Sequence, residues 1–210
     1  AISNEIPEFK GKVLDAGCGE MPYKELILNN KAVTSYTGLD VDFSLSYNGV
    51  KPDFLWDGNT MPFEDNSFDV VLSTEVMEHV PDPKKYLSEV YRVLNPGGKL
   101  FFTVPFLMPL HEIPNDYFRY TPYMLDVFLK ETGFTKIIVR ASGGYNAALA
   151  HMIGLWVNKY LWGRKKKLMR IIAKPIIQFL YKNDKPASDF KRTTMIVGVN
   201  GTAIKPKNTP

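Results

Sequence analysis

A glycine turn beside a carboxylate is the feature of this sequence that most directly suggests chemistry. The run Val13-Leu14-Asp15-Ala16-Gly17-Cys18-Gly19 places two glycines directly after an apolar segment typical of a β-strand. Glycines in such a turn let the backbone approach a ligand closely. No Gly-Lys-Ser/Thr follows at the Walker spacing, and the third glycine of the dinucleotide fingerprint would fall at Pro22. The turn therefore predicts a ligand site that matches neither of these phosphate-binding patterns.

Carboxylates at successive strand ends indicate what this ligand is. Asp15 lies at the turn itself, where it would repel a pyrophosphate and attract a positive or amino-bearing group. Asp40 ends the second expected strand and can accept hydrogen bonds from both hydroxyls of a ribose. Asp57 follows the third and can accept one from an adenine amino group. A ligand with these three parts is S-adenosylmethionine. Each Asp alone could be a turn or cap residue, so the prediction depends on the ordered set.

Short apolar runs alternate with helical patterns along the chain, which predicts an α/β protein with a parallel sheet. Asp82 and Pro83 begin one helix, and Thr121-Pro122 begins another. The composition is that of a globular protein, and we expect a single domain over residues 1–210. The expected strands cover residues 12–16, 35–39, 53–55, 68–73, 99–104, 134–140 and 194–199.

Three stretches together carry a resemblance to a known family. The sequences VLDAGCGEMPY, YTGLDVD and WDGNTMPFEDNSFDVVLSTEVMEHVPDPKKYLSEVYRVLNPGGKLFFTVPF resemble class I S-adenosylmethionine-dependent methyltransferases of the type 11 group, from about Gly11 to Pro105. The resemblance implies a Rossmann-like, doubly wound sheet of seven strands, mostly parallel with the last strand antiparallel. It also implies methyltransferase activity with S-adenosyl-L-methionine as the cofactor.

The resemblance also assigns cofactor contacts to residues after four successive strands. Met21 departs from the pattern, because many relatives have glycine there, and we expect it to narrow the turn. Residues 1–10 are too short for the helix that usually covers the cofactor, so we expect either that one side of the cofactor is open or that this sequence starts after that helix. The assigned cofactor residues are Asp15, Gly17, Cys18 and Gly19, then Asp40 and Val41, then Asp57 and Gly58, and finally Glu75.

The acceptor side is expected in the stretch HEIPNDYFRYTP, which begins at His111. Its polar and aromatic density suits a pocket for a sugar- or ring-shaped acceptor, and the stretch resembles methyltransferases of bacterial cell-surface glycan biosynthesis. We interpret His111, with Tyr117 and Arg119, as the catalytic group that orients or deprotonates the acceptor. Alternatively Tyr117 covers the core and Arg119 forms a local ion pair. For His79 we favour a structural role, and we expect no bound metal.

Residues 145–182 form a basic, helical insert before the last strand. Residues 1–150 carry 20 Asp and Glu against 13 Lys and Arg, whereas residues 151–210 carry 2 against 13. Tryptophans and aliphatic residues alternate with these cations, which favours peripheral contact with an anionic membrane or a lipid-linked acceptor over nucleic acid. Alternatively, the insert forms a helical cap over the ligand site or the contact face of a dimer. The sequence does not predict an oligomeric state.

Two further expectations concern location and function class. The single cysteine, Cys18, excludes an intramolecular disulfide, and the N-terminal residues lack the apolar run of a signal peptide, so we expect a cytoplasmic protein. The alternative to an enzyme is a non-catalytic module that binds S-adenosylmethionine and docks to a membrane or a protein through its basic insert.

Overall fold

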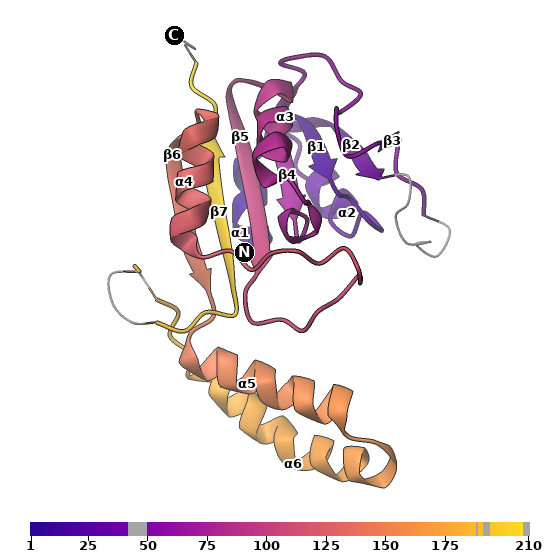
Figure 1. Ribbon diagram of the computed structural model, residues 1–210, viewed down its shortest axis with the longest axis vertical. Helices are drawn as coiled ribbons and strands as arrows, with labels where there is room; N and C mark the ends of the chain where they lie inside the picture. Colours follow the sequence, from indigo (N-terminus) through magenta and orange to yellow (C-terminus); the bar gives the residue numbers. More distant parts are fainter. Residues whose placement is uncertain (42–49, 188, 191–193, 208–210) are drawn as a thin grey trace.

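A computed structural model describes residues 1–41, 50–187, 189–190 and 194–207. Seven strands form one sheet in the order β3-β2-β1-β4-β5-β7-β6, and β7 is antiparallel to both of its neighbours (Figure 1). The expected fold, with its antiparallel last strand, is confirmed. The strands are β1 (Gly11–Ala16), β2 (Val33–Val41), β3 (Phe54–Trp56), β4 (Phe68–Thr74), β5 (Leu94–Pro105), β6 (Thr135–Ser142) and β7 (Gly198–Ile204).

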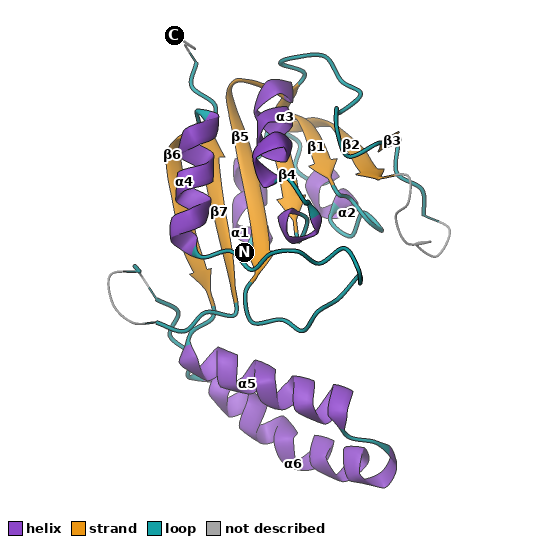
Figure 2. Ribbon diagram, viewed as in Figure 1, coloured by secondary structure: helices purple, strands orange, loops and turns teal. Residues whose placement is uncertain are grey.

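Helices cover both faces of the sheet (Figure 2). On one face, α3 (Pro83–Val93) and α4 (Pro122–Thr132) pack against alternate residues of the central strands, including Leu14 of β1. On the other face, Val13 packs with residues of α1 (Ile2–Glu5), the 3-10 turn η1 (Ile6–Glu8) and α2 (Lys24–Leu28). Strands buried on both faces read as continuous apolar runs, which is why β1 and β4 were recognisable in the sequence.

The helix starts were also predicted correctly. The Asp82 carboxylate accepts a hydrogen bond from the backbone N–H of Lys85, and the Thr121 hydroxyl accepts one from Met124. Pro83 and Pro122 occupy the first helical positions, where no backbone N–H is needed. Gly133 ends α4 in the left-handed conformation with φ of 104°.

The last strand was predicted too early. We expected residues 194–199, whereas β7 runs from Gly198 to Ile204. Three of the four residues directly before β7 are β-branched (Thr194, Ile196 and Val197), whereas β7 itself contains Gly198, Asn200 and Gly201, which have low strand propensity. Long-range pairing with β5 and β6 overrides that preference. Side chains would not fit at Gly201, because a Cβ there would lie 2.3 Å from the carbonyl oxygen of Ile138.

The basic insert is a helical hairpin beyond the carboxyl-end edge of the sheet (Figure 1). It consists of α5 (Tyr145–Leu155), a π-helical turn η3 (Trp156–Tyr160) and α6 (Gly163–Lys182). Asp184 fixes its base by accepting hydrogen bonds from the backbone N–H groups of Gly144 and Ala147, at 2.8 and 2.9 Å. The loop between β5 and α4 lies beyond the same edge of the sheet, so both segments border the ends of the parallel strands.

Candidate active site

A cavity of about 380 Å³ opens at the carboxyl ends of β1 to β4. Its lining comes from residues that end or follow each of these strands and from three residues of the loop after β5, namely Glu112, Ile113 and Asn115. Asp15, Cys18 and Gly19 are not among its lining residues. Of the expected cofactor residues, it is lined by Gly17, Asp40, Val41, Asp57, Gly58 and Glu75.

Asp40 is held in position by two backbone donors. Its Oδ2 accepts a hydrogen bond from Gly19 N–H at 2.9 Å, and its Oδ1 accepts one from Val41 N–H at 2.8 Å. Each oxygen retains a further lone pair, so the carboxylate can still accept bonds from two ligand hydroxyls. Burial raises the pKa of Asp40, and the two backbone bonds oppose that rise. Gly19 therefore contributes to the site by orienting Asp40 rather than by lining the cavity.

Gly17 forms the closest approach between the turn and the segment after β4. Its φ is +78°, and a Cβ there would lie 2.4 Å from a methyl carbon of Val76. Only glycine fits both constraints. Backbone N–H groups of Gly17 and Cys18 donate to the carbonyl of Leu39, which ties the turn to β2. The Cys18 side chain is buried, and burial raises the pKa of its thiol to about 12.

Asp15 lies beneath the turn rather than in the cavity wall. It is 1% exposed and faces the same side of the sheet as Val13, where the Tyr36 hydroxyl donates a hydrogen bond to Oδ2. Its Oδ1 has no hydrogen-bond partner among the described residues. Burial raises the pKa of Asp15 to about 7, and the bond from Tyr36 opposes the rise. Contact between Asp15 and the amino group of a ligand therefore stays a prediction.

The loop after β3 contributes an exposed carboxylate. Asp57 accepts hydrogen bonds from the backbone N–H groups of Asn59 and Thr60, at 2.8 and 3.2 Å, and these bonds lower its pKa. These bonds form a local turn. A turn residue is the alternative role that the sequence analysis allowed for Asp57, beside contact with an adenine. Gly58 has φ of +78°, and a Cβ added there would meet no atom within 4 Å, so the backbone is open toward the cavity.

Glu75 separates this cavity from a second one. Its Oε1 accepts a hydrogen bond from the Thr103 hydroxyl at 2.7 Å. The second cavity, of about 270 Å³, lies between the strand ends and α5, with Tyr23, Met108 and His151 among its lining residues. Because Glu75 lines both cavities, two ligands bound in them would meet at this side chain.

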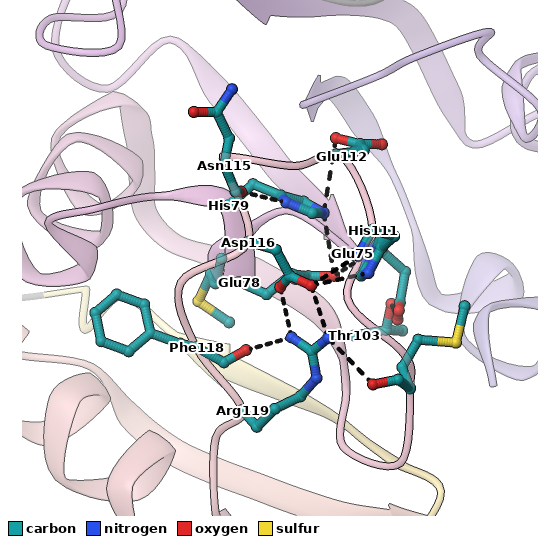
Figure 3. A network of polar contacts seen from close by, with 12 residues as sticks. Glu75, Glu78, His79, Thr103, His111, Glu112, Asn115, Asp116, Phe118 and Arg119 are labelled. Carbon is teal, nitrogen blue, oxygen red and sulfur yellow. Dashed lines mark hydrogen bonds and ion pairs between the residues drawn. The ribbon is translucent and has the colours of Figure 1, made fainter.

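Of the three expected acceptor residues, His111 and Arg119 belong to one polar network (Figure 3), and none of the three lines either cavity. Arg119 donates to both oxygens of Asp116, at 2.6 and 2.8 Å, and this bidentate pair holds the pKa of Asp116 well below its usual range. Asp116 Oδ2 also accepts from the backbone N–H of His111 at 3.0 Å and lies 3.2 Å from its Nδ1. Tyr117 is half exposed and donates to Asn115. Contact of these residues with an acceptor stays a prediction.

Glu78 is a residue that the sequence analysis missed. It lies in the 3-10 turn η2 (Met77–His79), is fully buried, and neither carboxylate oxygen has a hydrogen-bond partner among the described residues. Burial raises its pKa to about 8. His79 lines the cavity, and its Nε2 lies 3.8 Å from Glu78 Oε1. An acidic residue in a short turn normally faces solvent, so the sequence carried no signal of this burial.

Sheet order and cavity position together define an open α/β protein with a ligand site beyond the carboxyl ends of its strands. Residues 14–102 match the family model of the methyltransferase domain. This match, the strand order and the motif order support the predicted resemblance to the class I S-adenosylmethionine-dependent methyltransferases.

Curated relatives and solved structures support this assignment. A phthiotriol/phenolphthiotriol dimycocerosates methyltransferase of Mycobacterium ulcerans is 39% identical over 114 residues, which cover 50% of this chain and 41% of the relative. A ubiquinone biosynthesis O-methyltransferase of Coxiella burnetii is 34% identical over 105 residues, covering 45% and 44%. The chain thus spans under half the length of these relatives.

Similarity of fold extends over nearly the whole chain. A Haemonchus contortus phosphoethanolamine N-methyltransferase 2, solved with phosphomonomethylethanolamine and S-adenosylhomocysteine, has a TM-score of 0.59 at 19% identity and covers 94% of this chain and 49% of that one. At this identity the likeness establishes the fold, and the ligand shows that the same fold holds this type of cofactor in the worm enzyme.

Proposed function

We propose that this chain is an S-adenosylmethionine-dependent methyltransferase that acts on a small or carrier-linked acceptor, with a sugar hydroxyl of a cell-surface glycan as the leading candidate. The observation that carries the proposal is the Asp40 carboxylate, fixed by two backbone donors in a cavity that extends from Gly17 to Asp57 and Glu75. A carboxylate acceptor at this place suits the hydroxyls of a ribose in the middle of a ligand whose two ends differ.

The residues present fit the cofactor. Gly17 leaves the turn free of a side chain at that position, and Gly58 leaves the backbone accessible to a ligand at the opposite end of the cavity. Asp40 would accept bonds from the ribose, and Glu75 would lie at the methionine end. When bound, S-adenosylmethionine supplies a sulfonium methyl group, which an acceptor oxygen attacks as the carbon–sulfur bond breaks, so the hydroxyl proton must leave to a base.

His111 is the base that we assign to the acceptor hydroxyl. Its Nδ1 lies 3.2 Å from Asp116 Oδ2, which favours the tautomer with the hydrogen on Nδ1 and a free lone pair on Nε2. Arg119 fixes Asp116 and thereby positions His111. The name of the Coxiella relative, an O-methyltransferase, supports oxygen as the acceptor atom.

The second cavity provides a place for the acceptor. It borders the cofactor cavity at Glu75, and α5 forms one of its walls through His151. An acceptor carried on a lipid would reach this cavity beside the helical hairpin. The name of the Mycobacterium ulcerans relative, which refers to phthiotriol lipids, supports a lipid-linked acceptor.

We further propose that the hairpin contacts an anionic membrane surface. Leu168, Ile171, Ile172 and Phe179 form an exposed apolar stripe on α6, with exposed fractions from 47% to 72%. Exposed lysines of the same helix flank this stripe. No helix within the described ranges has the length and apolarity needed to cross a bilayer.

Transfer of a labelled methyl group tests the activity. With labelled cofactor and a lipid-linked glycan fraction, we expect the wild-type chain to label the acceptor. His111→Ala should reduce turnover about 10²- to 10⁴-fold, the usual contribution of a general base, with cofactor affinity unchanged. Cofactor binding without transfer by the wild type would instead favour the non-catalytic module. Equal losses of turnover and cofactor affinity in His111→Ala would contradict its assigned role.

Liposome flotation tests the membrane contact. The wild type should float with phosphatidylglycerol vesicles and not with phosphatidylcholine vesicles. Ile171→Asp should reduce flotation, because it places a charge in the apolar stripe. Val127→Asp is the matched control, since Val127 is an exposed apolar residue on α4, away from the hairpin. Equal flotation of both variants, or no preference for anionic lipid, would contradict the proposal.

A further inference from the structure

An unsatisfied buried carboxylate, Glu78, lies close to two histidine rings that contact each other edge to face (Figure 3). Glu78 Oε1 is 3.8 Å from His79 Nε2 and 4.0 Å from His111 Nε2. These distances are too long for hydrogen bonds. Buried polar groups normally have partners, so a fully buried carboxylate with both oxygens unpaired among the described residues points to a bound group.

The other nitrogen of each ring is engaged by an acceptor. His79 Nδ1 lies 2.7 Å from the carbonyl oxygen of Asn115, so it carries the hydrogen. His111 Nδ1 lies 3.2 Å from both Asp116 Oδ2 and the carbonyl oxygen of Pro109, so it carries the hydrogen too. In neutral rings, both Nε2 atoms then have free lone pairs within 4.0 Å of Glu78 Oε1. A carboxylate and two lone pairs that face one another are stabilised by a cation between them, either a proton or a metal ion.

We propose that Glu78, His79 and His111 bind a divalent transition-metal ion of the zinc type. One donor atom from each residue lies within 4.8 Å of the other two. Two nitrogen or oxygen ligands of tetrahedral zinc, with bonds of ~2.0–2.1 Å, lie about 3.3 Å apart, so the three side chains need to close by several tenths of an ångström or more. Glu112 Oε2, 3.7 Å from His79 Nε2, is a fourth donor at the edge of the cluster.

Both histidines have the outer contacts typical of metal ligands. A metal-bound histidine usually donates its second N–H to a carbonyl or a carboxylate, which fixes the tautomer and the ring. The carbonyl of Asn115 does this for His79, and Asp116, itself held by Arg119, does it for His111. A divalent ion would also offset the charge of Glu78 in its carboxylate form.

The ion would connect two segments that are far apart in the chain. Glu78 and His79 belong to η2, whereas His111 belongs to the loop after β5, so the ion would fix that loop against the cavity. His79 and Glu112 line the cavity, which places the open side of the ion toward a ligand. If the proposed transfer to a hydroxyl holds, His111 Nε2 would be occupied by the ion and could not act as the base; the ion would instead lower the pKa of the hydroxyl, whose proton would leave to water. Ion binding itself does not depend on that transfer.

Calorimetric titration of the untagged, chelator-treated chain with ZnCl₂, without cofactor, tests the proposal. We expect one ion per chain. His79→Ala and His111→Ala should each weaken binding at least about 100-fold, since loss even of an outer contact costs 10- to 100-fold. His151→Ala is the matched control, because His151 is the only other histidine of the chain and lies outside the cluster, and it should bind zinc like the wild type.

Glu78→Gln keeps the shape of the side chain, so it tests the metal site even if an alanine variant does not fold. It should also weaken zinc binding, with circular dichroism unchanged. Absence of zinc binding by the wild type would overturn the proposal, and so would equal weakening in His151→Ala. Binding of S-adenosylhomocysteine, measured separately on the same samples, shows whether the proposed function stands when the metal site fails.

Discussion

Replacement of Asp15 by Asn tests how the glycine turn is built. Asp15 is 1% exposed, and burial raises its pKa from 3.8 to about 7. Between pH 4 and pH 7 the folded chain keeps a proton on Asp15 that the unfolded chain has lost. The stability of the wild type therefore falls as pH rises through this window because of this group, and the loss is complete above pH 7.

The size of the effect follows from the shift. About three pKa units at ~1.4 kcal/mol each correspond to roughly 4 kcal/mol. Asn cannot ionise, and its carbonyl oxygen can still accept the bond from Tyr36. The free energy of unfolding of Asp15→Asn minus that of the wild type should thus rise by roughly 4 kcal/mol from pH 4 to pH 8, as an order of magnitude.

Urea unfolding of both chains at several pH values measures this difference. Asp57→Asn is a suitable control, because Asp57 is exposed and its pKa is lowered, so its variant should change only at acid pH and in the opposite direction. A difference between Asp15→Asn and the wild type that stays constant from pH 4 to pH 8 would refute the argument. So would a wild type that gains stability relative to the variant as pH rises.

Three further changes test neighbouring parts of the site. Gly17→Ala should destabilise the chain by about 1–3 kcal/mol in urea unfolding and weaken cofactor binding, because φ is +78° and the added Cβ meets Val76; wild-type stability would contradict this. Tyr36→Phe should lower the free energy of unfolding by about 1–3 kcal/mol at pH 8, because Asp15 loses the hydrogen bond from the Tyr36 hydroxyl; a smaller loss of stability at pH 8 than at pH 4 would contradict this. Cys18, buried and with its pKa raised to about 12, should react with a thiol reagent only after unfolding; fast labelling of the native chain would contradict it.

The features that could be predicted from the sequence are those that a short run of neighbouring residues specifies. Apolar runs buried on both faces marked β1 and β4, and Asp82 and Thr121 marked two helix starts. Asp40 was placed correctly at the cavity because a strand end fixes its position. These features depend on neighbouring residues, so the order of residues alone specifies them.

Features that depend on distant residues were not predictable in the same way. The bounds of β7 are set by pairing with β5 and β6, although its glycines disfavour a strand. The side-chain orientation of Asp15 depends on its hydrogen bond with Tyr36 of the neighbouring strand. The burial of Glu78 depends on the loop after β5, which brings His111 to within 4.0 Å of it from 33 positions along the chain. Tertiary packing, which periodicity does not report, decides each of these.

Calorimetry with S-adenosylhomocysteine tests the central claim, that Asp40 and the glycine turn hold this cofactor. The wild type should bind one molecule per chain, and Asp40→Ala should lower the affinity by roughly 1–3 kcal/mol, or about 5- to 150-fold, the usual effect of removing a charged hydrogen-bond acceptor. Absence of heat with millimolar ligand and the wild-type chain, or equal affinity of the two chains, would contradict the account.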